Sequence, residues 1–233
     1  MKSKDAKKGD IYVVGGGKGG VGKSFTTIAL VDSLEQAGVK VLVIESDTSN
    51  PDVWKMYKDQ IETRLIDLDD ANGWIDLVNA CDEFKEHVVV INTAARNNKG
   101  VVAYGETLNI TLVELGRELT TLWVINRQRD SLELLKEYRD ALPGTKVHVI
   151  RNGYFGDEQK FELYNSSKTR EMIESEGGKS LLLPDLADRV SDDLYSKRLS
   201  VSKAMTELPI GNRAELSRWR RDATRMISEV IDG

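Results

Sequence analysis

A glycine-rich stretch with two lysines, GGGKGGVGKS at residues 15–24, holds the residues whose types and spacing most directly suggest chemistry. From Gly17 to Ser24 it fits the pattern G-x-x-x-x-G-K-[ST], between an apolar run and a helical pattern. Glycines let the backbone turn its N–H groups around phosphate oxygens, and the following helix adds its positive dipole end. Lys23 would neutralise the β- and γ-phosphates, and the Ser24 hydroxyl would coordinate Mg²⁺. The stretch therefore predicts a site for a nucleoside triphosphate and Mg²⁺.

The second lysine of this loop, Lys18, needs a different role, because one lysine is enough to hold a phosphate. The spacing K-G-G-x-G-K-[ST] resembles the deviant Walker A loop of the ParA/MinD family of P-loop ATPases. The resemblance implies that Lys18 crosses a homodimer interface and touches phosphates held by the other subunit, as an arginine finger does. The alternative is a loop lysine that faces water. The resemblance also implies a nucleotide-binding loop made of Gly17, Lys18, Gly19, Gly20, Val21, Gly22, Lys23, Ser24 and Phe25.

Two acids follow the second apolar run, in VLVIESDTSNPDV, and resemble the family's switch I. The resemblance makes Asp47 the acid that orients the attacking water, so that Lys18, Lys23 and Asp47 are the predicted catalytic residues. Glu45 matches an acid, normally aspartate, that faces the magnesium shell. The alternative is that Asp47 caps a turn and Glu45 is only a charge at a strand end.

A departure from the family pattern occurs at Asn92, in VVVINTAAR, where the family usually places an aspartate that holds Mg²⁺ through a water. Asparagine keeps the shape but loses the charge, and a charge-assisted hydrogen bond is roughly twice as strong as a neutral one. The predicted metal set is therefore Ser24, Glu45, Asp47 and Asn92, with weaker Mg²⁺ binding and slow hydrolysis, partly offset by Glu45. On this reasoning Asn92→Asp should raise one or both. The following RNNKG resembles switch II, a loop expected to move with nucleotide state.

The adenine side of the site is predicted from two later segments. Asn152, in VIRNGYF, aligns with an asparagine that hydrogen-bonds the adenine edge in this family, and an amide suits adenine because it both donates and accepts. The alternative is an asparagine that turns a strand into a loop. A second wall is expected from LLLPDLADR, around Pro184 and Asp185.

The elements that must position these residues alternate between short apolar runs and helical patterns. The runs are mostly continuous rather than alternating, as expected for a parallel sheet covered by helices on both faces. We therefore expect one doubly wound α/β domain over residues 11–233, of the P-loop NTPase type, after a lysine-rich disordered tail at residues 1–10. The expected strands span 11–16, 39–45, 63–68, 87–93, 120–126, 146–152 and 179–184. The expected helices span 21–38, 51–58, 74–84, 107–118 and 130–142, with a loop at 96–106 and two or three closing helices.

The last segment, NRAELSRWRRDATRMISEVIDG, carries Leu216, Trp219, Ala223, Met226 and Val230 as one apolar stripe, which predicts packing on the domain. Arginines lie mostly off this stripe. Small ParA proteins bind DNA nonspecifically through basic surfaces, so the resemblance implies phosphate contacts from Arg218, Arg220 and Arg221. The alternative is an ordinary solvated face.

Composition limits the possible functions of the chain, which has 233 residues and a formal net charge of −5. A globally basic nucleic-acid protein is excluded, although a local basic patch is not. One cysteine, Cys81, sits at a helical core position, and it is too few for the iron–sulfur relatives of the family. No secretory signal or apolar run of membrane length is visible, and the acidic end SEVIDG argues against the membrane helix of MinD. We therefore expect a cytoplasmic protein that does not bind membranes.

The resemblance implies a ParA-like ATPase whose ATP-bound homodimer positions or segregates DNA, in plasmid partition or conjugative transfer. A centromere-binding protein or another adaptor would be its partner, and ATP and Mg²⁺ its cofactors. Two alternatives stay open. One is an ATP-dependent ligase or synthetase of the same fold, which would need a substrate pocket and have no use for Lys18. The other is a nucleotide-binding interaction module that barely hydrolyses, which Asn92 suggests.

Overall fold

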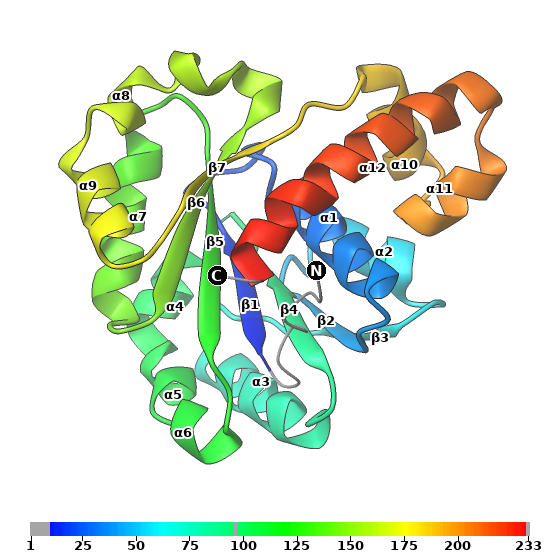
Figure 1. Cartoon of the computed structure of the whole chain (residues 1–233). Coiled ribbons are helices and arrows are strands. Elements are labelled where there is room, and N and C mark those ends of the chain that lie inside the picture. The colour runs from blue at the N-terminus through cyan, green and yellow to red at the C-terminus, as the bar shows by residue number, and fades with distance from the viewer. Residues whose placement is uncertain (1–9, 96, 232–233) are drawn as a thin grey trace.

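The structure, a computed structural model, describes residues 10–95 and 97–231 and is built around one parallel sheet of seven strands (Figure 1). The strand order is β3-β2-β4-β1-β5-β6-β7, and every pairing is parallel. The strands are β1 Ile11–Gly15, β2 Val41–Glu45, β3 Glu62–Leu65, β4 Val88–Asn92, β5 Leu119–Ile125, β6 Lys146–Asn152 and β7 Ser180–Leu183. The predicted doubly wound α/β fold is confirmed, and the predicted tail lies outside the described residues except for Asp10.

Helices cover both faces of this sheet and enclose two hydrophobic cores. One face carries α1 Lys23–Gln36, α2 Asp52–Tyr57, α10 Asp188–Ser196, α11 Val201–Glu207 and α12 Ile210–Ile231. The other carries α3 Ala71–Glu83, α4 Asn98–Tyr104, α5 Glu106–Asn109, α6 Leu112–Leu115, α7 Asp130–Ala141, α8 Glu162–Asn165 and α9 Lys168–Ser175. Two 3₁₀ turns, Gly153–Phe155 and Glu158–Lys160, follow β6. Burial on both faces explains why β1, β2 and β4 consist almost entirely of buried residues.

The segment at 96–106 corrects the sequence prediction, because most of it is helix α4 rather than loop. Gly100 allows close packing, because a Cβ there would lie 1.9 Å from the carbonyl oxygen of Leu68. The helix expected at 107–118 is instead two short helices, α5 and α6, and Gly116 ends the second with a φ of 64°. The sequence predicts a loop at 96–106 because small residues are also typical of loops, whereas in the structure they allow α4 to pack closely.

The last helix, α12, lies along α1, and the predicted apolar stripe is buried (Figure 1). Trp219 is its anchor. The Trp219 ring lies 4.8 Å, centroid to centroid, from the ring of Phe25 on α1, and its Nε1–H donates to the carbonyl oxygen of Pro184 at 2.9 Å. The C-terminal helix therefore supports both the glycine-rich loop and the segment after β7.

In the described part of the chain, no helix is both long and apolar enough to cross a membrane. The strand order runs outward from β1 in both directions. In open α/β sheets, ligands bind at the carboxyl ends of the strands where the order reverses. The glycine-rich loop, Glu45 and Asn92 all lie at that end, on β1 and the two nearest strands of one side.

Candidate nucleotide-binding site

The glycine-rich loop joins β1 to α1 in a backbone conformation that needs its glycines. Gly20 has a φ of 75° and Gly22 a φ of 105°, a region that side chains other than glycine rarely adopt. A Cβ on Gly22 would also lie 2.3 Å from Nδ2 of Asn152. The loop therefore turns tightly around the start of α1, as a phosphate cradle requires.

Lys23 lies buried under this loop, and its Nζ donates to the carbonyl oxygen of Lys18 at 2.9 Å. Burial lowers the pKa of Lys23 to about 8, although the carboxylates of Asp47 and Glu45 favour its charged form. A phosphate that enters the loop would give the Lys23 ammonium group an ionic partner. This position fits the predicted phosphate contact.

Lys18 is half exposed and forms an ion pair with Asp130, the first residue of α7 in the same chain. The Lys18 side chain is 44% exposed and that of Asp130 is 49% exposed. Exposed pairs of this kind are worth little, so the lysine is available to another partner. The Lys18 side chain faces the surface, as the water-facing alternative expects. Its contact with the phosphates of another subunit stays a prediction.

A buried polar cluster joins the ends of β2 and β4 to the start of α1. Nδ2 of Asn92 donates to both carboxylate oxygens of Glu45, at 2.9 and 3.1 Å, and lies 3.4 Å from Oγ of Ser24. Oγ1 of Thr27 donates to Oδ1 of Asn92 at 3.0 Å. Glu45 is fully buried, and this burial raises its pKa to about 7 against the opposing effect of the N–H donors of Asp47 and Asn92. The structure therefore brings three of the four predicted metal residues together.

Asp47, the fourth, is half buried just outside this cluster. Its backbone N–H donates to Oε1 of Glu45 at 3.0 Å, and its Oδ1 accepts from the N–H of Asn50 at 3.1 Å. The turn-capping alternative is thus present in the structure. The Asp47 carboxylate is still close enough to favour the charged form of Lys23.

The described residues contain no group of three or more His, Cys, Asp or Glu side chains arranged to hold a metal ion. Mg²⁺ in nucleotide sites uses one or two carboxylates together with substrate phosphates and water. The Ser24 hydroxyl and the buried Glu45 carboxylate both face Nδ2 of Asn92, so an N–H donor group separates these two predicted oxygen ligands in this structure.

Sequence analysis missed a connection between the loops after β2 and β4. Ser46 is fully buried, and its hydroxyl bonds to Oδ1 of Asn97 and to the carbonyl oxygen of Asn92. Nδ2 of Asn97 reaches Oδ1 of Asp69 at 2.8 Å. The sequence gives one indication of this role of Ser46. It lies between Glu45 and Asp47, and alternate residues of an extended segment point to opposite sides.

Asn152 does not offer its amide to a base in this structure. Its Nδ2 donates to the carbonyl oxygen of Val21 at 2.9 Å, and its Oδ1 accepts from the N–H of Tyr154 at 3.1 Å. Asn152 is also 6% exposed. The amide is thus committed to the glycine-rich loop and the turn after β6, which is the structural alternative for this residue.

Beside Asn152 lies a pocket of about 150 Å³, suited to one edge of a base rather than a whole nucleotide. It is lined by Gly20, Phe25, Asn152, Tyr154, Asp185, Leu186, Ser191 and Tyr195. The predicted second wall is thus formed by Asp185 and Leu186, while the carbonyl of Pro184 is taken by Trp219. Tyr195 on α10 had no signal in the sequence, because it reaches the pocket from a distant helix.

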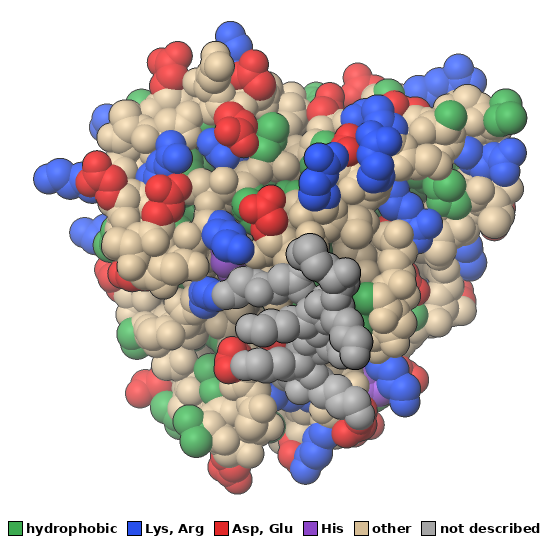
Figure 2. Space-filling model, viewed as in Figure 1, with side chains coloured by type: hydrophobic (Ala, Val, Ile, Leu, Met, Phe, Trp, Pro, Cys, Tyr) green, Lys and Arg blue, Asp and Glu red, His purple; other side chains and the backbone are tan. Residues whose placement is uncertain are grey.

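The three predicted DNA-contacting arginines differ in their surroundings. Arg220 forms two hydrogen bonds of 2.8 Å to the carboxylate of Asp32, which is 2% exposed, so it holds α12 against α1. Arg218 pairs with Glu215, and Arg221, 69% exposed, pairs with Asp222. Basic and acidic side chains are mixed across the face shown in Figure 2. The bonds of Arg220 weigh against the predicted phosphate contact for that residue.

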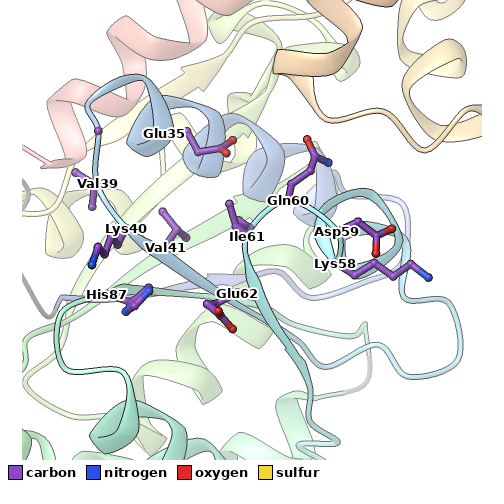
Figure 3. Close-up of a pocket in the computed structure, with 11 residues that line it drawn as sticks. Glu35, Val39, Lys40, Val41, Lys58, Asp59, Gln60, Ile61, Glu62 and His87 are labelled. Carbon is purple, nitrogen blue, oxygen red and sulfur yellow. The ribbon is translucent and has the colours of Figure 1, made fainter.

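A separate cavity of about 690 Å³ lies at the opposite edge of the sheet, near the amino ends of β2, β3 and β4 (Figure 3). Lys40, Glu62 and His87 lie at those strand starts, and Glu35 extends from α1. The lining mixes both charge signs and contains none of the predicted site residues, so the candidate nucleotide site is confined to the carboxyl edge.

Comparison with known proteins identifies the family of this chain. A family model described as the CobQ/CobB/MinD/ParA nucleotide binding domain matches residues 12–152. Protein MobD of Acidithiobacillus ferrooxidans is 67% identical over 221 residues, which cover 95% of this chain and 97% of MobD.

Two solved structures share the fold. MinD of Aquifex aeolicus has a TM-score of 0.54 and 14% identity, covering 91% of this chain and 95% of that one. The cell division ATPase MinD of Pyrococcus furiosus has a TM-score of 0.55 and 16% identity, covering 95% of this chain and 99% of that one.

Proposed function

This chain belongs to the CobQ/CobB/MinD/ParA nucleotide-binding family, and on that premise we propose that it is a slow ATPase whose ATP-bound form is a homodimer. The unit that dimerises is a single P-loop domain, residues 11–233. Formation and hydrolysis of the dimer would switch the attachment of DNA or of an adaptor protein in the cytoplasm, in plasmid partition or conjugative transfer.

The observation that carries this proposal is the placement of the two loop lysines. Lys23 is buried beneath the glycine-rich loop, and Lys18 is half exposed at its rim, where it forms an ion pair with Asp130. A cation needed by its own nucleotide would be better placed inside the loop, as Lys23 is. Lys18 is accessible to the phosphates of a second copy, where it would stabilise the charge of the transferring phosphoryl group.

The remaining groups have separate roles in this proposal. The loop N–H groups and Lys23 bind the phosphates, Ser24 and Glu45 hold Mg²⁺, and Asp47 orients the attacking water. Bound Mg²⁺ would neutralise charge on the phosphates. The adenine base would enter the pocket bounded by Tyr154, Asp185 and Tyr195.

DNA and an adaptor are the partners of the dimer in this proposal. Arg218 and Arg221 remain the candidate phosphate contacts on α12, because Arg220 is bonded to Asp32. Such contacts would give sequence-independent binding that weakens steeply with salt. A small ParA-like switch would also need an adaptor to recognise its cargo.

The experiment is sedimentation of the protein with no nucleotide, with ADP and with Mg²⁺-ATP, using Asp47→Ala to slow hydrolysis. We expect a dimer only with Mg²⁺-ATP and a monomer for Lys18→Ala under the same conditions. Lys85→Ala, an exposed lysine between α3 and β4 at the opposite edge of the sheet, is the matched control and should dimerise as the wild type does. A monomer at every concentration with bound ATP would refute the proposed switch.

A ligase or synthetase of the same fold would instead bind ATP without dimerising and would turn over only with a second substrate. A nucleotide-binding module would dimerise without measurable turnover. Phosphate release, measured with and without DNA on the same samples, separates these alternatives from the proposed ATPase.

A further inference from the structure

The loop after β2 is tied to the end of β4 by Ser46, which lies directly before Asp47. Ser46 is fully buried, and its backbone N–H donates to the carbonyl oxygen of Asn92 at 3.0 Å. Its hydroxyl lies 3.1 Å from the same carbonyl oxygen and accepts from the N–H of Ala94 at 3.0 Å. The residue next to Asp47 is therefore anchored to the adjacent strand.

Asn97 holds the other side of this contact. It is the residue before α4, where an asparagine side chain usually accepts an N–H from the first turn of the helix. Asn97 makes no such cap. Its Oδ1 instead bonds to the Ser46 hydroxyl and accepts from the N–H of Ala94 at 2.6 Å, and the residue is 1% exposed. The side chain of Asn97 thus bonds a neighbouring loop rather than its own helix.

The amide of Asn97 also reaches a third segment. Its Nδ2 donates to Oδ1 of Asp69 at 2.8 Å, a charge-assisted bond to the loop between β3 and α3. About one turn along α4, Gly100 packs against the backbone of Leu68 in that same loop. The start of α4 therefore packs on one loop and bonds to Ser46 of another, so a displacement of α4 would be transmitted to the loop after β2.

Asp47 depends on this arrangement for its position. Its backbone N–H donates to Oε1 of Glu45, and its Oδ1 accepts from the N–H of Asn50. These bonds stay within the segment after β2, whereas the adjacent Ser46 supplies the bonds to β4 and, through Asn97, to α4. Misplacing a reacting group by about 1 Å can cost about a hundredfold in rate.

We propose that Ser46 and Asn97 are positioning residues, whose side chains join the loop after β2 to the start of α4 and hold Asp47 where hydrolysis needs it. The inference rests on the proposed ATPase activity, but not on DNA binding or on the choice of metal ligands. It gives two buried side chains a role in turnover that needs no contact with the nucleotide.

The test compares the kcat for ATP hydrolysis with the calorimetric affinity for ATPγS. Ser46→Ala should lower kcat by at least about tenfold, while the affinity for ATPγS changes by less than about twofold. This variant should fold, because the buried groups around the lost hydroxyl keep partners. The N–H of Ala94 keeps Oδ1 of Asn97, and the carbonyl of Asn92 keeps the backbone N–H of residue 46.

The matched control is Ser200→Ala. Ser200 is likewise fully buried, and its hydroxyl donates to Gln60, 140 positions away, at 2.7 Å. This variant should lose a comparable amount of stability in urea and keep the wild-type kcat. Asn97→Ala should lower kcat as Ser46→Ala does, and the double variant should lose no more than the worse single variant, since both changes remove one link.

A kcat for Ser46→Ala within about twofold of the wild type would overturn the inference. Equal losses of kcat in Ser46→Ala and Ser200→Ala, or a double-variant loss equal to the product of the single losses, would also overturn it. A wild type that binds ATP but releases no phosphate would instead refute the proposed ATPase, and hydrogen exchange would then decide on the link. Exchange at residues 98–104 should be at least about fivefold faster in Ser46→Ala than in Ser200→Ala, and equal exchange would show that no link exists.

Discussion

Replacing Asn152 with alanine separates the sequence interpretation of this residue from the structural one. If Asn152 contacts adenine, only ligands with a base should be affected. In the structure, however, its amide bonds to the carbonyl of Val21 within the glycine-rich loop and to the N–H of Tyr154. The variant should therefore weaken phosphate binding whether or not a base is present.

The size of the effect follows from the groups left without partners. Asn152→Ala leaves a carbonyl and an N–H unpaired at a position that is 6% exposed. An unsatisfied buried polar group costs about 1–3 kcal/mol. If the loop must recover its shape on binding, the affinity for phosphates should fall by about 5- to 150-fold, since 1.4 kcal/mol is tenfold. The free energy of unfolding should fall by a similar amount.

The assay is calorimetric titration with ADP and, separately, with inorganic tripolyphosphate, which has no base. Both affinities should fall by about the same factor. Asn126→Ala is the control, because Asn126 also ends a strand and caps its own loop, bonding to Gln128 and Ser131. Tripolyphosphate affinity that is unchanged while ADP affinity falls would refute this reasoning and restore the adenine contact.

Three further predictions concern stability and reactivity. Arg220→Ala should cost about 2–4 kcal/mol of unfolding free energy in urea, since it leaves the buried Asp32 carboxylate with Gln36 but without a cation. Arg221→Ala should cost under about 0.5 kcal/mol, and equal costs would contradict the assigned roles. Burial lowers the pKa of His148 to about 4 from 6.5, so stability should be complete above pH 6.5 and fall by at most about 3 kcal/mol as the pH drops to 4. His148→Asn should show a weaker acid dependence in the same urea melts, and an identical profile would refute this cause. Burial raises the pKa of the Cys81 thiol to about 11, so native protein at pH 8 should react with a disulfide reagent only as fast as it unfolds, and rapid labelling would show an accessible thiol.

Much of the fold could be predicted because its signals are local. Continuous apolar runs such as VLVIE and VVVI mark strands buried on both faces, and the glycine spacing marks the loop at the end of β1. The stripe around Trp219 likewise gives the packing of α12. These features depend on residues that are a few positions apart, and the periodicity of the sequence indicates them directly.

Sequence prediction is weakest where a distant contact decides the role of a residue. Arg220 lies 188 positions from Asp32, and Asn152 lies 131 positions from Val21. The residues next to Arg220 and Asn152 in the sequence therefore do not indicate these partners. The sequence predicts a loop at Gly100, whereas in the structure this glycine lets α4 approach the backbone at Leu68. The chemistry at Asn92 depends on which way its amide points, and only the acid on the adjacent strand determines that.

The central claim is that Lys18 of one copy completes the nucleotide site of another. The direct test mixes equal amounts of Lys18→Ala and Asp47→Ala, each inactive alone, and measures phosphate release. Each mixed dimer would have one complete site, with its own Asp47 and the partner's Lys18, and one incomplete site. Phosphate release should therefore return, to no more than about half of the wild-type rate. No recovery from a mixture shown to form mixed dimers would contradict the account, because Lys18 would then act only within its own chain.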